Sequence, residues 1–129
     1  MIFVDTSVWI EFLRGRDPTL LAEMKQQLED AQVAMAAPVR IEVLAGVRAS
    51  EVPRLRRALS ALPVFYPSRD TWDRMEEWAL KAATAGKRFG MSDLLIASLA
   101  AERGGQLWSL DDDFREMARL RFVKLFAAG

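Results

Sequence analysis

Five short apolar segments, separated by helical patterns, constrain the fold of this chain more than any other feature of its sequence. These segments, interpreted as strands, are residues 2–4, 32–36, 63–67, 106–110 and 121–126. Between them, apolar residues recur three and four positions apart, a spacing typical of amphipathic helices. Short apolar strands that alternate with helices predict an α/β fold, with a mostly parallel central sheet covered by helices on both faces.

Helix boundaries are predicted from prolines, glycines and capping residues. The first helix is expected to stop near Gly15, the third to run from Pro38 through residue 49, and Ser92 to cap the sixth. The other helices are expected to begin at Asp17, after Pro53, at Ser68 or Asp70, and at Asp111. In a parallel sheet, a ligand site forms beyond the carboxyl ends of the strands, so the residues that follow each strand are of most interest.

Cysteine and histidine are both absent, which excludes disulfides, thiolate metal sites and imidazole as a general base. The length suits one domain, expected to span residues 1–129, and the lack of cysteine is compatible with a cytoplasmic protein. Asp5 interrupts the apolar N-terminus, unlike a signal peptide, and the apolar run at residues 94–101 is too short for a membrane span. We therefore expect no membrane association. Lysine and arginine number 18 together, as do aspartate and glutamate, so net charge does not attract nucleic acid.

Four acidic residues stand out because of their surroundings. Asp5 directly follows the first strand, and Asp111 follows the strand at residues 106–110. Glu42 lies inside the third helix and Asp93 opens the sixth, and each shares a helix face with small and apolar residues. Taken singly, each acid has an ordinary explanation, as a helix cap, as a surface residue, or as a first-turn acid favoured by the helix dipole.

The coincidence of all four acids favours a different interpretation. Carboxylates that meet in one cleft repel each other, and no residue that would neutralise them is obvious from the sequence. Arg40 lies on a different side of its helix from Glu42, and Lys87 and Arg88 precede Asp93 in a loop. A divalent cation removes this conflict, and oxygen ligands without sulfur or imidazole suit Mg²⁺ or Mn²⁺ better than Zn²⁺. The sequence therefore predicts a hard metal ion at the ends of the strands.

Four segments together resemble the acidic motifs of PIN-domain ribonucleases, and most closely those of VapC-type toxins from toxin–antitoxin pairs. They are DTSVWIEFL at the N-terminus, IEVLAG around Glu42, MSDLLIASLA around Asp93, and SLDDDF ending at Phe114. The resemblance extends from residue 1 to about residue 125. It depends on the four motifs occurring in order, since each motif alone is common.

This resemblance implies a fold, an activity and partners. The fold is a three-layer α/β/α sandwich with a parallel sheet. The activity is that of an endoribonuclease, a toxin that cleaves RNA with bound Mg²⁺ or Mn²⁺. The partners are a second copy of the chain, in a homodimer, and a cognate antitoxin that inserts into the active-site groove and inhibits the nuclease.

The resemblance also implies roles for individual residues. By position, Asp5, Glu42 and Asp93 match the three core acids of the family. The fourth acid matches Asp111, and Asp113 is the competing match. A supporting hydroxyl of the family, which assists the metal or the first aspartate, corresponds to Ser7, with Thr6 as the alternative.

Basic residues close to the motif ends are candidates for binding RNA phosphates, although an ordinary solvated surface position is the alternative for each. They are Arg14, Arg16, Arg40, Lys87 and Arg88. Trp9 and Trp108 are expected in the core. Large apolar residues of the fourth and fifth helices belong either to the core or to a contact with a second subunit or the antitoxin. They are Leu55, Leu59, Leu62, Trp72, Met75 and Trp78.

Two other functions are open at this point. A phospho-acceptor signalling domain also carries acids at strand ends, but it needs an adjacent acidic pair after the first strand, where this chain has only Asp5. A binding module with the same fold and no nuclease activity, acting with a DNA-binding partner, is the second. The presence of all four acids argues against such a module.

Overall fold

Five parallel strands form one sheet in this computed structural model, which describes residues 1–127. The strands are β1 Ile2–Val4, β2 Val33–Ala36, β3 Val64–Phe65, β4 Gln106–Trp108 and β5 Lys124–Leu125. Their order across the sheet is β3-β2-β1-β4-β5, and every neighbouring pair is parallel. The predicted parallel sheet is confirmed, and residues 128 and 129 of the predicted domain lie outside the described residues.

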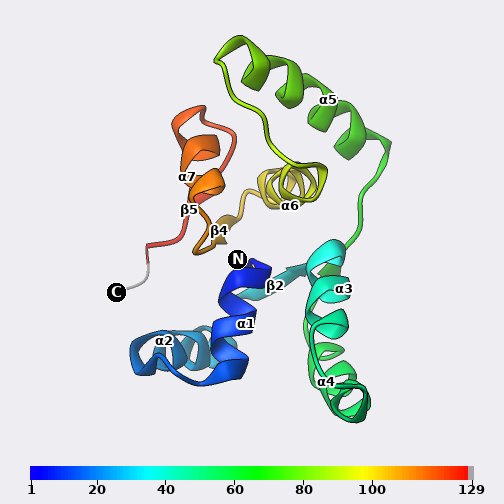
Figure 1. The fold of residues 1–129 in the computed structure, drawn as a ribbon, viewed down its shortest axis with the longest axis vertical. Helices are drawn as coiled ribbons and strands as arrows, with labels where there is room; N and C mark the ends of the chain where they lie inside the picture. The colour runs from blue at the N-terminus through cyan, green and yellow to red at the C-terminus, as the bar shows by residue number, and fades with distance from the viewer. Residues whose placement is uncertain (128–129) are drawn as a thin grey trace.

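Helices cover both faces of this sheet, as the sequence predicts. They are α1 Thr6–Arg14, α2 Pro18–Glu29, α3 Ala37–Ala45, α4 Val52–Leu59, α5 Arg69–Thr84, α6 Met91–Glu102 and α7 Asp112–Arg119, with a short 3₁₀ helix at Ala49–Glu51. Helices α1 to α4 lie on one side of the sheet and α5 to α7 on the other (Figure 1). The result is the expected three-layer α/β/α sandwich. None of the helices described in residues 1–127 is long and apolar enough to cross a membrane.

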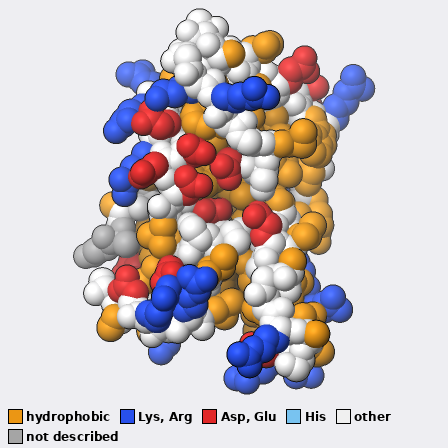
Figure 2. Space-filling view, viewed as in Figure 1, with side chains coloured by type: hydrophobic (Ala, Val, Ile, Leu, Met, Phe, Trp, Pro, Cys, Tyr) orange, Lys and Arg blue, Asp and Glu red, His pale blue; other side chains and the backbone are white. Residues whose placement is uncertain are grey.

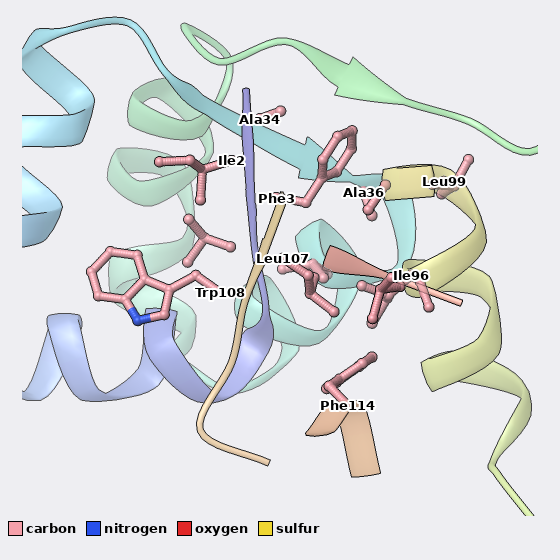
Figure 3. Packing of buried hydrophobic residues seen from close by; sticks show 14 of the residues in the cluster. Ile2, Phe3, Ala34, Ala36, Ile96, Leu99, Leu107, Trp108 and Phe114 are labelled. Atoms are coloured by element: carbon pink, nitrogen blue, oxygen red, sulfur yellow. The ribbon is translucent and has the colours of Figure 1, made fainter. Parts of the chain in front are cut away.

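The central strands are buried between the two helical layers. Phe3 of β1, Leu107 of β4 and Phe114 of α7 belong to the core shown in Figure 3. A Cβ atom on Gly105 would lie 3.0 Å from two atoms of the Phe3 ring, so glycine lets the chain enter β4 close against β1. Trp9 and Trp108 are 3% and 5% exposed, which confirms that both belong to the core.

The large apolar residues of α4 and α5 divide between core and surface. Leu59, Met75 and Trp78 are buried, whereas Trp72 is 46% exposed. Leu55 and Leu62 are partly buried against the core. Trp72, Phe89 and Met91 line a shallow cavity of about 330 Å³ between α5 and α6. We call this surface the α5–α6 face.

Two predicted boundaries on the way to the functional edge are wrong, for local backbone reasons. Helix α3 ends at Ala45 and does not continue to residue 49, because Arg48 is extended before the 3₁₀ helix begins. Gly90, not Ser92, is the N-cap of α6, since Gly90 is extended and its carbonyl accepts the Leu94 N–H at 3.1 Å. Ser92 and Asp93 therefore both lie in the first turn of α6.

The last strand is shorter than the predicted span of residues 121–126. Only Lys124–Leu125 pairs with β4. Arg121 adopts a positive φ of 65°, which turns the chain sharply after α7 and leaves Phe122 and Val123 to pack in the core before the strand begins. This segment lies on the far side of β4 from β1 and does not alter the functional edge.

Candidate metal centre

The two central strands create a crevice at their carboxyl ends. Strand β1 is flanked by β2 on one side and by β4 on the other, and the chain leaves β1 and β4 toward opposite helical layers. In open α/β sheets this reversal leaves a ligand site beyond the strand ends. Acidic side chains gather at the centre of this face of the molecule (Figure 2). Five carboxylates contribute here, named the acid cluster below: Asp5, Glu42, Asp93, Asp111 and Asp113.

Asp93 lies at the middle of the acid cluster. One carboxylate oxygen of Asp93 and one each of Asp111 and Asp113 lie within 4.8 Å of one another. The pKa of Asp93 is raised from 3.8 to about 6. Partial burial is the largest cause, and the charges of the other acids, Asp111, Asp5, Asp113 and Glu42, contribute the rest in that order. The four other acids therefore all act on Asp93 as like charges, although they come from three other segments of the chain.

Asp5 is the buried member of the cluster, at 5% exposure. Its side chain does not cap α1, which removes the ordinary explanation for an aspartate at this position. Instead, its Oδ2 atom accepts hydrogen bonds from the Ser7 hydroxyl at 2.9 Å and from the Ser109 hydroxyl at 2.7 Å. The Thr6 hydroxyl is buried and has no hydrogen-bond partner among the described residues, so of the two hydroxyls proposed from the sequence, Ser7 is the one that contacts Asp5.

Glu42 reaches the cluster from the opposite helical layer. It lies on α3 and is exposed, although the sequence placed it among small and apolar neighbours. The Ser92 hydroxyl donates to Glu42 Oε1 at 3.3 Å, which links the first turn of α6 to α3 across the crevice. Of the charges that raise the pKa of Asp93, that of Glu42 has the smallest effect.

Asp111 and Asp113 both face Asp93, so the geometry brings together both candidates for the fourth acid. Asp111 is also the N-cap of α7, where its Oδ1 accepts the Asp113 N–H at 3.0 Å. Asp112 lies between them but pairs with Arg115 at 3.1 Å, away from the cluster. At the start of α7, Asp111 and Asp113 thus belong to the acid cluster, whereas Asp112, which lies between them in sequence, is neutralised by Arg115.

The donor set fits a hard divalent cation. Within residues 1–127, no lysine or arginine forms an ion pair with any member of the acid cluster. All the converging side-chain ligands are carboxylate or hydroxyl oxygens, which suit Mg²⁺ and Mn²⁺. Repulsion among these acids, which adds to partial burial in raising the pKa of Asp93, is what a bound cation would relieve.

The basic residues predicted to contact RNA lie outside the cluster. Arg14 pairs with Glu11 at 3.2 Å at the end of α1. Lys87 pairs with Glu116 at 3.4 Å, beside α7. Arg40 is half-buried on α3, and Arg88 is exposed in the loop before α6. Lys87 and Arg88 lie nearest in sequence to Asp93, since this loop leads directly into the first turn of α6.

Two residues that lie at the site were not predicted from the sequence to be there. Ser109 contacts Asp5, and Ser92 contacts Glu42, although Ser92 was expected to cap a helix. A signal for Ser109 exists in the strand register, because Val4 pairs with Trp108 and the next residues along both strands are Asp5 and Ser109. Side chains that follow paired strand residues lie side by side, so a hydroxyl next to Asp5 follows from this pairing.

Comparison with known proteins identifies the family. Residues 2–120, which make up nearly the whole chain, match the PIN domain family. The chain belongs to the PIN domain family. This PIN domain is 31% identical over 125 residues to Ribonuclease VapC11 of Mycobacterium tuberculosis and to VapC ribonuclease Mb1587 of Mycobacterium bovis, with 93% of both chains covered in each case. The resemblance drawn from the four motifs is thus confirmed.

Solved structures share the fold of this PIN domain. FitAcB from Neisseria gonorrhoeae aligns with a TM-score of 0.80 at 22% identity, covering 99% of this chain and 98% of that one. VapBC2 from Rickettsia felis, bound to a DNA fragment from its promoter, aligns with a TM-score of 0.78 at 21% identity, covering 98% of each chain.

Proposed function

We propose that this PIN domain, with residues 1–129 as its single domain, is a metal-dependent endoribonuclease that acts as the toxin of a toxin–antitoxin pair. The observation that carries the proposal is the acid cluster, whose five carboxylates converge without a neutralising lysine or arginine among the described residues. The relatives that share 31% of its sequence over nearly their whole length are VapC ribonucleases.

The acids would supply ligands to the cation from different positions in the fold. Asp93, Asp111 and Asp113 already bring one oxygen each within 4.8 Å of the others, so they need little rearrangement to share one ion. Asp5 presents its carboxylate from the buried side, and Glu42 from the other helical layer. When bound, Mg²⁺ or Mn²⁺ supplies a Lewis acid for the phosphodiester and lowers the pKa of water, which replaces the histidine that this chain lacks.

Substrate RNA would be held by basic residues around this acidic centre. Arg14, Arg40, Lys87 and Arg88 are the residues we propose for its phosphates. Arg88 carries no ion pair among the described residues, whereas Lys87 has to exchange Glu116 for a phosphate. RNA contact by Lys87 therefore releases Glu116, which still pairs with Arg119.

We propose two protein partners for this cytoplasmic toxin. An antitoxin is suggested by structural neighbours such as VapBC2, which are toxin–antitoxin complexes. A cavity of about 590 Å³ beside α1 and α3 offers such a partner a surface of mixed character. Its lining includes the apolar residues Ile10, Leu13 and Val43 and the charged residues Arg14, Arg48 and Glu51. A second copy of the chain would bury the α5–α6 face, where Trp72 and Met91 are 46% and 70% exposed.

Cleavage of RNA by the purified protein in Mg²⁺ or Mn²⁺ tests the proposed function. Asp5→Ala and Asp93→Ala are expected to lower the rate by about 100-fold or more, because each removes a ligand for the cation. Asp112→Ala is the matched control, since Asp112 pairs with Arg115 and should leave the rate unchanged. Equal rates in the parent and in both cluster variants would show that a contaminating nuclease cuts the RNA.

A further inference from the structure

Ser109 lies beside the acid cluster and makes three contacts there. It follows β4, just as Asp5 follows β1, and its hydroxyl donates to Asp5 Oδ2 at 2.7 Å. The same hydroxyl oxygen accepts the backbone N–H of Asp111 at 3.0 Å. It also lies 3.3 Å from the Ser7 hydroxyl. Ser109 thus touches the first acid and the backbone of the fourth at once.

The protons of the two serines can be assigned from these contacts. Ser7 Oγ accepts the Leu110 N–H at 3.0 Å, and Ser109 Oγ accepts the Asp111 N–H, so each oxygen has a backbone donor aimed at it. Each hydroxyl has one hydrogen to give. The short distances of 2.9 and 2.7 Å show that both hydrogens go to Asp5 Oδ2. The Ser7–Ser109 contact is then a close approach of two oxygens without a hydrogen between them.

This arrangement leaves the two oxygens of Asp5 unequal. Oδ2 is occupied by two hydroxyl donors, whereas Oδ1 has no hydrogen-bond donor within the part of the chain that the structure describes. A carboxylate held by two hydrogen bonds on one oxygen keeps one rotamer and offers its other oxygen to a cation as a single ligand. The backbone bond to Asp111 ties this orientation to the start of α7, which carries Asp113.

We propose that Ser109 is a positioning residue of the metal centre, which together with Ser7 fixes Asp5 so that only Oδ1 binds the cation. This inference rests on the proposed function, because it requires that the acid cluster binds Mg²⁺ or Mn²⁺. Ser109 does not bind the cation in this arrangement. It acts through Asp5, and it links the ends of β1 and β4 across the crevice.

Calorimetric titration of the purified protein with Mn²⁺ tests the role of Ser109 without reference to cleavage. Ser109→Ala is expected to weaken Mn²⁺ binding by about 10-fold or more, the cost of losing a residue that orients a metal ligand. Ser109→Thr keeps the hydroxyl and should restore most of the affinity. Ser60→Ala is the control, because the exposed Ser60 hydroxyl likewise donates one hydrogen bond, to the Arg57 carbonyl at 2.7 Å, and lies far from the cluster in sequence.

The possible results separate the two ideas. Parental affinity in Ser109→Ala, or weak binding in both Ser109 variants, overturns the positioning role and leaves the nuclease proposal intact. No Mn²⁺ binding by the parent overturns both. A double variant with Ser7→Ala gives a further check, since two donors to one oxygen should show non-additive losses, whereas additive losses contradict the shared Oδ2.

Discussion

Helix α7 separates two groups of acidic residues that behave in opposite ways. On one side, Asp111 and Asp113 join Asp93, whose pKa is raised to about 6 by partial burial and by neighbouring carboxylates. On the other side, Asp112 pairs with Arg115, and Glu116 pairs with Lys87 and Arg119. Desolvation raises the pKa of Glu116, but the hydrogen bond from Lys87 and the charges of Arg119 and Lys87 outweigh it and lower the pKa.

The contrast teaches how an acidic binding site differs from an acidic surface. Asp111 is the N-cap of α7, and Asp112, Asp113 and Glu116 lie within this helix, so position on the helix does not explain the difference between the two groups. The difference is the set of partners, since each outward acid has an arginine or lysine and the inward acids have only one another. Removing a cation-ligand acid should therefore cost activity, whereas removing a paired acid should cost only its surface ion pair.

Neutralising the three consecutive aspartates one at a time tests this division most strongly. Asp111→Asn and Asp113→Asn are each expected to lower Mn²⁺-dependent RNA cleavage by about 10- to 100-fold, because each removes a charged oxygen near Asp93. Asp112→Asn should cleave like the parent. Steady-state rates on one RNA substrate measure all three. A loss in only one of Asp111→Asn and Asp113→Asn would identify the fourth acid. An equal loss in Asp112→Asn would contradict the division between acids of the cluster and paired surface acids.

Stability against pH, without added metal, tests the raised pKa of Asp93, which burial and the neighbouring carboxylates cause together. The pKa of Asp93 is about 6 in the folded protein against an ordinary value of 3.8, so the folded state binds the proton more tightly. The parent should therefore be most stable below pH 3.8, as far as Asp93 is concerned, and lose this contribution as the pH rises to about 6.

Asp93→Asn removes that titration and should unfold at a higher temperature than the parent above about pH 6. Thermal unfolding followed by circular dichroism across this pH range makes the measurement. Mn²⁺ should stabilise the parent more above pH 6 than below it and should leave the variant unaffected. Identical pH profiles for the two proteins would contradict a raised pKa of Asp93 in the folded protein.

Glu116→Gln should give the smallest effect. Its lowered pKa means that the ion pairs stabilise the folded protein above the ordinary pKa and are lost as the pH falls through the folded value. The variant is therefore expected to unfold at a slightly lower temperature near neutral pH, with the difference vanishing at about 1 M salt. Mn²⁺ affinity should not change, and a clear loss of affinity would place Glu116 with the inward acids.

Much of this centre could be predicted because its acids follow strands or open helices. Asp5 and Asp111 come directly after apolar segments, and the rule for parallel sheets brings such positions to one edge. Asp17 behaves as the sequence predicts too, since its side chain accepts the Thr19 and Leu20 N–H groups at the start of α2. These features depend on local patterns that a single sequence contains.

The parts that escaped prediction depend on neighbours distant in the sequence. Ser109 contacts Asp5 across 104 positions, and Ser92 contacts Glu42 across 50, so no local pattern reveals either bond. Ser92 also has the residue type of a helix cap, yet Gly90 takes that position because the chain is already extended there. The choice between Asp111 and Asp113 could not be made, since both side chains turn toward Asp93.

The pairing of β1 with β4 has a consequence for how the protein is made. β1 is synthesised first, but its partner on the β4 side and the aspartates beyond it come more than a hundred residues later. A nascent chain on the ribosome therefore carries Asp5, Glu42 and Asp93 without a complete centre until translation is almost finished. Fragments that end before residue 111 lack the last two carboxylates of the acid cluster, so we expect them not to cleave RNA.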